Sequence, residues 1–402
     1  MRFVNLLPPL LGTALLTIGI GSYSTLTTLQ LQDLHYSVWA IGWVASLYFA
    51  GMIAGSYYAQ AVIIRMKHVR AYVFFALIMA LAALLQGFIP NAWVWAVMRF
   101  ASAFCLGGLY IVIESWLLAA CEERYKGQIM AVYLLIFYAF QSFSQLWLTI
   151  NYSHEWMPFA VIAVWVSISI IPVIFAKAAV PLSKHAKMAS PWVFIKLVPF
   201  GTSASLVSGL MFAMVYTLYP LFLVKAGFNT AHIASLMSIT ILGGALLQLP
   251  IGKISDLMDR RLVLIFVSLG LAIVALLMAF TYKHYDILAL LSFILGGLVF
   301  VIYPLSISHA SDCVNKTLAL SAVSILTLAY SLGSMIGPLI MSGLLTSFGD
   351  PGFFVYIVLS SGLLALYGVF NVIKYKHKVE GRFQANFPEA VMGEQNVQTR
   401  SN

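Results

Sequence analysis

The acidic residue Glu114 has the clearest capacity for chemistry in this sequence. It lies inside an apolar segment, eight residues before Glu122, so its carboxylate is about 12 Å along a helix from the charged end. An ionised carboxylate is costly in hydrocarbon, which makes an intramembrane acid a functional candidate. Burial favours the neutral acid, as a proton carrier requires. The alternative is a structural carboxylate that an arginine or tyrosine of a neighbouring helix holds in place.

Arg99 is the only basic residue that we place inside an apolar segment. It lies 15 residues before Glu114, about 22 Å along a helix, so the two side chains cannot pair directly. Their angular separation of roughly 60° allows both to face one cavity. Arg99 is a candidate for tuning a proton site or holding an anionic substrate. Its structural alternative is to bind helix carbonyls near the outer end and extend outward.

Amide and tyrosine side chains inside apolar segments are the candidate substrate lining, because amides in lipid need partners and should face the interior of a helix bundle. Each has a structural alternative as an interfacial anchor or a helix contact. The candidates are Tyr23, Gln30, Gln141, Gln145, Tyr216, Tyr219, Gln248, Tyr303 and Tyr330.

Glycines at the centres of apolar segments remove side chains where helices cross. They serve either as hinges for a conformational change or as sites of close helix packing, and we favour packing. A proline within such a segment adds a local bend. The residues concerned are Gly107, Gly108, Gly296, Gly297, Gly333, Gly337 and Pro338.

The elements that position these residues must be membrane-spanning helices. Of 402 residues, 62% are hydrophobic and 9% are charged, and the mean hydropathy is +0.95. A spanning helix needs about 20 apolar residues. The sequence predicts an all-α membrane protein with twelve spans, at 6–31, 40–64, 71–90, 92–120, 127–150, 157–179, 198–224, 231–251, 262–281, 286–310, 317–346 and 352–374.

The basic residues predict the orientation. Of 22 lysines and arginines, 19 fall at the two termini or at alternate junctions between spans, which places both termini in the cytoplasm. We therefore expect a multi-pass protein of a bacterial inner membrane, in contact with the lipid bilayer. The net charge of +9 lies in short runs between apolar segments, which argues against nucleic acid as a partner.

The two halves of the chain resemble each other. Leu106-Gly-Gly-Leu109 recurs as Leu295-Gly-Gly-Leu298, at the equivalent span of each half. Internal repeats of this kind place a substrate site between the halves, near the bilayer midplane. We expect two pseudo-symmetric six-helix bundles at 1–179 and 198–374, a cytoplasmic linker at 180–197 and a cytoplasmic polar tail at 375–402.

The strongest motif is Gly252-Lys-Ile-Ser-Asp256-Leu-Met-Asp259-Arg260-Arg261-Leu-Val-Leu264. It resembles the G-x-x-x-D-x-x-G-R-R/K-x-x-L/I pattern of the major facilitator superfamily, with Asp259 where glycine is usual. The motif needs a tight turn, together with an acid and a basic fork that latch neighbouring helix ends in one state. Gly252, Asp256, Arg260 and Arg261 are the expected latch. The equivalent junction, near 60–70, lacks the glycine and the acid.

Further residues are similar to a YcaD-like bacterial branch of that superfamily: Arg99, Val112-Ile-Glu114-Ser115 and Pro250-Ile-Gly-Lys253. The resemblance implies alternating access by rocking of the two bundles. We expect proton-coupled secondary transport of a small organic molecule, with Glu114 and Arg99 in the coupling, the proton gradient as energy source and no cofactor. The alternatives are an uncoupled facilitator of a polar metabolite and a receptor or scaffold without transport.

Several motifs of other protein classes are absent from the sequence. It has no G-x-x-x-x-G-K-S/T loop, no H-E-x-x-H and no G-x-S-x-G, so it carries no recognisable ATPase, metalloprotease or hydrolase site. Its three cysteines have no C-x-x-C spacing, and we expect neither a disulfide framework nor a metal site. We expect a monomer that is not an enzyme.

Overall fold

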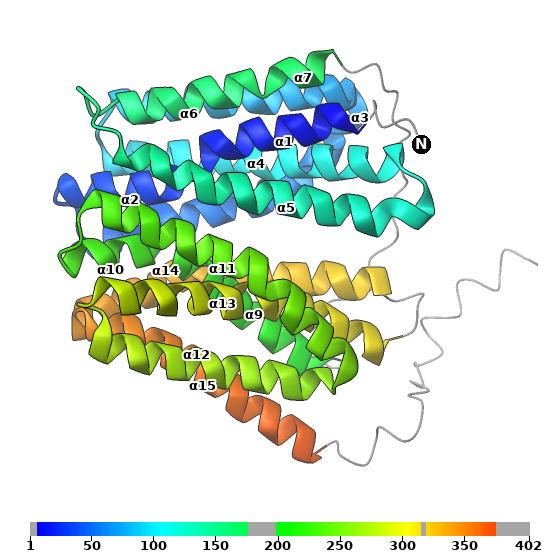
Figure 1. Cartoon of the computed structure of the whole chain (residues 1–402). Coiled ribbons are helices and arrows are strands. Elements are labelled where there is room, and N and C mark those ends of the chain that lie inside the picture. Colours follow the sequence, from blue (N-terminus) through cyan, green and yellow to red (C-terminus); the bar gives the residue numbers. More distant parts are fainter. Residues whose placement is uncertain (1–5, 176–197, 315–318, 375–402) are drawn as a thin grey trace, which may run out of the picture.

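The computed structural model describes residues 6–175, 198–314 and 319–374, and this part of the chain is all helical (Figure 1). The first half contains α1 (Leu7–Ile20), α2 (Tyr23–Asp33), α3 (Val38–Phe88), α4 (Ala92–Ala120), η2 (Glu123–Tyr125), α5 (Lys126–Ser144), η3 (Gln145–Thr149), α6 (Met157–Ile168) and α7 (Ile170–Ile174). The second half contains α9 (Pro199–Ala213), η4 (Met214–Leu218), α10 (Tyr219–Lys225), α11 (Thr230–Leu257), α12 (Arg260–Thr281), α13 (Tyr285–Cys313), α14 (Ala319–Phe348) and α15 (Pro351–Lys374).

The described helices make twelve membrane crossings, as the sequence predicts. Eleven continuous helical segments are long and apolar enough to span a bilayer. One of them, α3, has 51 residues and breaks at Lys67, where φ is 64° and ψ is 164°. The predicted spans 40–64 and 71–90 are therefore the two arms of α3, joined without a loop.

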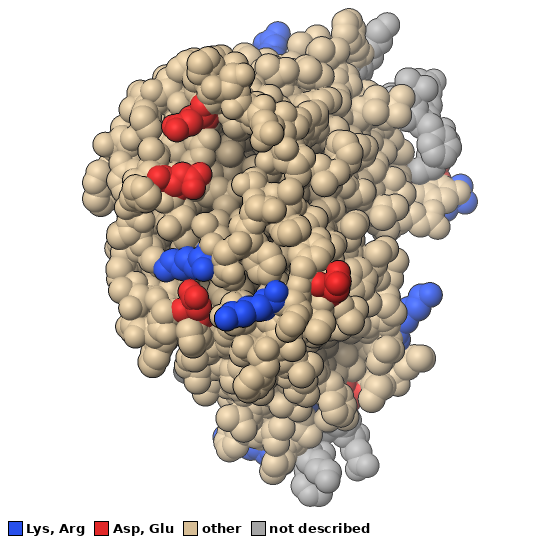
Figure 2. Space-filling model, turned by 60° about the vertical axis from the view of Figure 1, so that its left-hand side comes forward, with Lys and Arg blue, Asp and Glu red and all other residues tan. Residues whose placement is uncertain are grey.

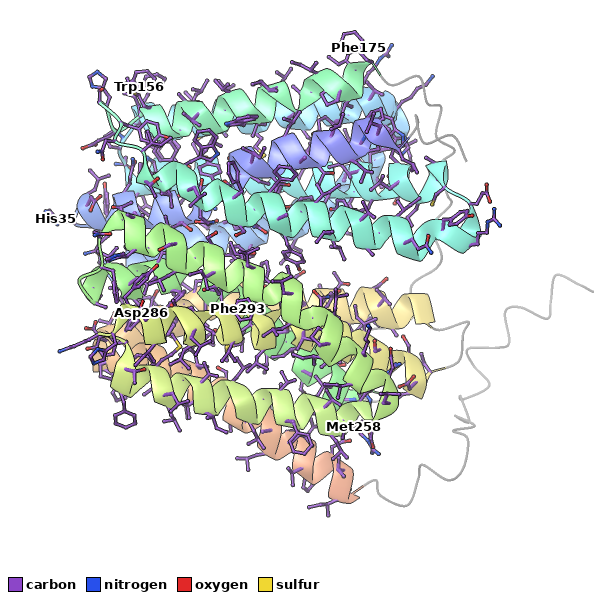
Figure 3. All side chains as sticks on the ribbon, in the orientation of Figure 1. His35, Trp156, Phe175, Met258, Asp286 and Phe293 are labelled. Carbon is purple, nitrogen blue, oxygen red and sulfur yellow. The ribbon has the colours of Figure 1, made fainter. Side chains whose placement is uncertain are left out.

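Successive crossings alternate in direction, so the junctions fall at two ends of the molecule. His35, Trp156 and Asp286 lie at one end, and Phe175 and Met258 lie at the other (Figure 3). Leu7 and Lys374, where the described helices begin and end, share the side of Phe175 (Figure 1). We call the two sides the His35 end and the termini end.

Two spans are irregular near their middles. The first crossing is interrupted at Gly21 and Ser22, between α1 and α2. The seventh contains a π-helical turn, η4, followed by Pro220 in the first turn of α10. Such turns leave backbone groups outside the regular ladder and often lie at functional positions.

Glycines hold the helices of each half in close contact. A Cβ on Gly55 of α3 would lie 2.0 Å from the carbonyl oxygen of Phe104 in α4. A Cβ on Gly243 of α11 would lie 1.9 Å from the carbonyl oxygen of Phe293 in α13. The first contact joins the second and fourth spans, and the second contact joins the eighth and tenth spans, so equivalent spans pack together in each half. The internal repeat seen in the sequence is therefore also a repeat of helix packing.

The candidate hinge glycines lie at the same kind of contact. Added Cβ atoms on Gly107 and Gly296 would meet the backbone of the neighbouring span, at Met52 and Thr240 respectively. Gly108 and Gly297 face the side chains of Phe75 and Leu247, and Gly333 and Gly337 face α9 at Leu206 and Leu210. Pro338 lies within α14. A Cβ would clash at every one of these glycines except Gly337, where the fit would be tight, and such close contacts are the signature of small-residue packing.

Charged residues concentrate at the termini end. The described junctions there carry Arg65, Lys67, Arg70, Arg124, Lys126, Lys253, Arg260, Arg261 and Lys374. The described basic residues of the His35 end are Lys225 and Lys283, and its acidic residues are Asp33, Glu155, Asp286 and Asp350. Figure 2, which brings the His35 end forward, shows these scattered charges on a mostly uncharged face.

Candidate functional site

Glu114 is half-buried, lies six residues before the end of α4 and faces α5. The hydroxyl of Tyr133 donates a hydrogen bond to its Oε1 over 3.3 Å. Among the described residues no lysine or arginine lies within salt-bridge distance of this carboxylate. Charge-assisted O–H···O⁻ bonds are typically about 2.5–2.7 Å long, so the contact with Tyr133 is weak. The carboxylate is therefore partly buried, and no strong hydrogen bond or ion pair from a described residue fixes it in place.

Aromatic side chains connect this carboxylate to the second half of the molecule. Tyr133 and Tyr110 both lie near Phe137, which contacts Tyr138, with ring centroids 5.3 Å apart. Tyr138 in turn packs on Phe300 of α13 at 5.6 Å. From there the chain of rings continues through the second half. We call Tyr138, Phe212, Tyr216, Phe300, Tyr303 and Tyr330 the aromatic cluster.

The aromatic cluster offers flat faces together with hydroxyl groups. Tyr216 stacks on Phe300, with an interplanar angle of 15°. Tyr330 lies 4.7 Å from the ring centroid of Tyr303. The hydroxyl of Tyr216 donates to Oε1 of Gln141, and that of Tyr303 pairs with Thr327. Residues of both halves therefore contribute aromatic faces and hydroxyl groups to this cluster.

Four of the nine predicted lining residues join this cluster: Gln141, Tyr216, Tyr303 and Tyr330. Four others hydrogen-bond to neighbouring segments of the first or second half instead. Tyr23 donates to Gln86, Tyr219 pairs with Ser292, Gln145 donates to the carbonyl of Gly21, and Gln30 donates to the carbonyl of Glu155. Gln248 is half-buried on α11, away from these contacts.

The sequence reasoning missed several residues of the site. Tyr133, Phe137 and Gln141 follow one another at four-residue spacing along α5, which puts them on one face of the helix. That spacing could have identified Tyr133 and Phe137. Phe212 and Phe300 carry no such signal, because phenylalanine is common on every face of a helix in lipid.

Arg99 lies apart from Glu114, as the spacing predicts. It is 2% exposed. Its guanidinium is held between two rings, 4.3 Å from the centroid of Tyr23 and 4.1 Å from that of Tyr48. Its Nη2 donates to Ser24 Oγ over 2.6 Å. The structure does not place it in one cavity with Glu114.

The two halves touch through neutral hydroxyl groups near the His35 end. We call these contacts the seam: Thr28 donates to the carbonyl of Thr217, Ser46 to that of Met335 and Ser342 to that of Val38, and Ser142 pairs with Ser238. Each contact joins a helix of the first half to a helix of the second half, so the seam holds the His35 end closed.

The same helix faces separate toward the termini end. Tyr57 lies eleven residues after Ser46 on α3, within about 20° of it around the helix, and is 78% exposed. Leu135 is seven residues before Ser142 and is 61% exposed. Leu249 is eleven residues after Ser238 and is 70% exposed. In Figure 1 the helices of the two halves also diverge toward this end. The halves are therefore closed at the His35 end and apart at the termini end.

The expected latch lies within the second half. Nη1 of Arg260 donates to the carbonyl of Ser308 and to Asp312, at 2.7 and 3.0 Å, and Nη2 donates to Asp256 over 3.2 Å. Arg260 thus joins α11, α12 and α13. Asp312 is a partner that the motif alone did not reveal. Gly252 lies inside α11 with open space around it, so the turn of the motif is at Met258 and Asp259 instead.

Asp259 forms its own pair with Arg261. Its carboxylate accepts hydrogen bonds from Nε and Nη2 of Arg261, the latter over 2.7 Å. It also caps α12, because it accepts a hydrogen bond from the backbone N–H of Arg261. Burial opposes the ionisation of Asp259, but the hydrogen bonds and charge of Arg261 outweigh it and lower the pKa of the carboxyl below its ordinary 3.8. An aspartate at this position therefore begins the helix and pairs with its second residue.

Comparison with known proteins agrees with the fold. The model of the major facilitator superfamily matches residues 10–244 and 201–392. The chain is 29% identical over 352 residues to the MFS-type transporter YcaD of Escherichia fergusonii, covering 86% of this chain and 90% of that protein. It is 30% identical over 355 residues to YcaD of a strain of Escherichia coli, with the same coverage.

Solved structures share the architecture. The nucleoside transporter NupG superposes with a TM-score of 0.72 at 15% identity, covering 94% of this chain and 100% of that one. A bacterial homologue of the human lysosomal transporter Spinster, in an inward-facing and occupied conformation, superposes with a TM-score of 0.72 at 14% identity, covering 94% and 98%.

The twelve crossings, the repeated helix packing and these matches define a multi-pass membrane transport protein, and the chain belongs to the major facilitator superfamily. Within that superfamily it is a YcaD-like transporter.

Proposed function

We propose that this protein is a proton-coupled secondary transporter of a small organic molecule in a bacterial inner membrane. The observation that carries the proposal is the position of Glu114. Its carboxylate has no cationic partner among the described residues and adjoins, through Tyr133 and Phe137, an aromatic cluster shared by both halves. A carboxyl group in such a place can take up and release a proton as the halves rearrange.

The substrate that suits the aromatic cluster has a planar ring and is neutral or carries one positive charge. Stacked tyrosine and phenylalanine faces favour flat rings. Glu114 is the one charged group beside the cluster in the described structure, since Arg99 is enclosed by Tyr23 and Tyr48. A thermal-shift screen of metabolites, nucleosides, aromatic amines, siderophores and drugs on the purified protein identifies a substrate, because selective binding stabilises the folded state.

Alternating access is the proposed mechanism. With both termini in the cytoplasm, as the basic residues indicate, the structure is closed on the outside by the seam and open toward the cytoplasm. Transport then requires the seam to separate while the termini end closes. The contacts of Arg260 stay within the second half, so they keep three helix ends together as that half moves.

The test is uptake into proteoliposomes with an imposed pH gradient, using the substrate from the screen. Glu114→Gln is expected to lower gradient-driven accumulation at least tenfold while substrate exchange without a gradient persists, because the amide preserves shape but carries no proton. Glu122→Gln, at an exposed residue just beyond the end of the same helix, is the matched control and should transport normally. Undiminished accumulation by Glu114→Gln removes Glu114 from the coupling.

An uncoupled facilitator is the competing function. It predicts that substrate only equilibrates across the membrane and that a protonophore changes nothing. If the wild-type protein accumulates substrate and a protonophore abolishes this accumulation, the uncoupled facilitator is excluded.

A further inference from the structure

A small cavity with a mixed polar and apolar lining lies beside Arg99, between the two halves and near the His35 end. Its lining includes Ser24, Thr27 and Thr28 of α2, Arg99 of α4 and Thr217 of η4. The remaining lining residues are apolar: Leu31, Ile41, Val44 and Ala45. The hollow has room for about one water-sized species. Neither Glu114 nor any residue of the aromatic cluster lines it.

Arg99 brings an unbalanced positive charge to this cavity. The guanidinium is buried, and among the described residues no carboxylate lies within salt-bridge distance of it. Its Nη1 has no hydrogen-bond partner. The two tyrosine faces and the Ser24 hydroxyl compensate only part of the lost hydration, because a buried charge needs both an opposite charge and satisfied donors.

The donors around the cavity favour an anion over a second cation. The hydroxyls of Thr27, Thr28 and Thr217 already donate to backbone carbonyls. Ser24 Oγ accepts from Arg99, and no described group accepts the proton of its hydroxyl. Two donors, Nη1 of Arg99 and the hydroxyl of Ser24, therefore remain for one ligand.

We propose that this cavity binds a chloride ion. A monatomic anion fits the space, accepts from both free donors and neutralises the guanidinium. A carboxylate or phosphate ester is too large for the cavity, and a water molecule leaves the charge uncompensated. Because Thr217 belongs to the second half and the other polar lining residues to the first, bound chloride also favours closure of the seam.

The experiment measures thermal unfolding of the purified full-length protein as sodium chloride replaces sodium gluconate at constant ionic strength. The wild-type midpoint is expected to rise saturably, by about 3 °C. Bromide should act like chloride, whereas sulfate should not because of its size. An equal midpoint in chloride and gluconate overturns the proposal and assigns the cavity to water.

Two variants locate the effect. Arg99→Gln is expected to abolish the response to chloride, and Ser24→Ala to raise the half-saturating concentration about tenfold. The matched controls are Arg124→Gln and Ser203→Ala, which remove an exposed arginine and a serine hydroxyl elsewhere and should respond as wild type does. If Arg99→Gln does not fold, Ser24→Ala decides, because it leaves the charge in place. A wild-type response in Ser24→Ala contradicts the site.

Discussion

At the scale of single residues, the proposed chemistry of this protein depends on two charged side chains inside membrane-spanning helices, where charged groups are costly. Glu114 and Arg99 were identifiable from the sequence, because an acid or a base inside an apolar segment is rare. Their partners were not. Tyr133, Tyr48 and Ser24 come from other helices, and helical periodicity carries no information about which face of which neighbour lies opposite.

Asp259 shows how one residue changes a familiar motif. Asp259→Ala should lower the free energy of unfolding by about 1–2 kcal/mol, since it removes both the helix cap and the ion pair. Asp259→Asn keeps a capping side chain and should lose only about 0.5 kcal/mol. Thermal unfolding of both variants beside wild type measures the difference.

The pH dependence of Asp259→Asn follows from the lowered pKa of Asp259. A carboxyl whose folded-state pKa is depressed adds stability above its unfolded pKa and loses it as the pH falls through the folded value. The deficit of Asp259→Asn should therefore be constant from about pH 8 to 5 and shrink only below the ordinary 3.8. A deficit that changes between pH 8 and 5 contradicts the assignment, as does an alanine variant no weaker than the asparagine variant.

At the scale of helices, the sequence predicted the twelve crossings because hydropathy and charge alone determine where the chain can leave the bilayer. The run of Arg65, Lys67 and Arg70 marked the junction between two spans correctly. It did not show that the junction is a single residue in α3. Lys67 adopts a φ of 64° and a ψ of 164°, a region that essentially only glycine occupies without strain.

Replacement of Lys67 by glycine should stabilise the protein. The relief of backbone strain, about 1–3 kcal/mol, exceeds the conformational entropy that a glycine adds to the unfolded chain, about 0.5–1 kcal/mol. The midpoint of thermal unfolding should rise. Arg65→Gly, two residues earlier in regular helix, removes the same charge and should lower the midpoint. If both glycine variants lower it equally, Lys67 is not strained.

At the scale of the whole molecule, the sequence indicated two similar halves but not which end of them is closed. That depends on the seam, whose serines and threonines look like many others in the chain. Only their contacts across the halves, such as Ser142 with Ser238 at 2.6 Å between hydroxyl oxygens, distinguish them. The π-helical turn at η4 was likewise unpredicted, since its residues have no distinctive composition.

A disulfide across the seam should stop transport. In a background without Cys105, Cys121 and Cys313, cysteines at Ser142 and Ser238 are expected to cross-link under mild oxidation, abolish uptake and release it again on reduction. Cysteines at Leu135 and Leu249, on the same helix faces toward the open end, provide the control and should stay unlinked. Uptake that persists in fully cross-linked protein would show that the seam need not separate.

The hydrogen bonds of the seam also influence how fast the two halves can separate at the His35 end. Each of its bonds joins uncharged groups, and exchanging such a bond for one with water changes the free energy by only about 0.5–1.5 kcal/mol. Separating the two halves at the His35 end is therefore a low barrier made of several small contributions, because among the described residues no ion pair joins the two halves there. Temperature and the lateral pressure of the surrounding lipid, which act on packed area, should therefore affect how often this end opens, in addition to any chloride bound beside Arg99.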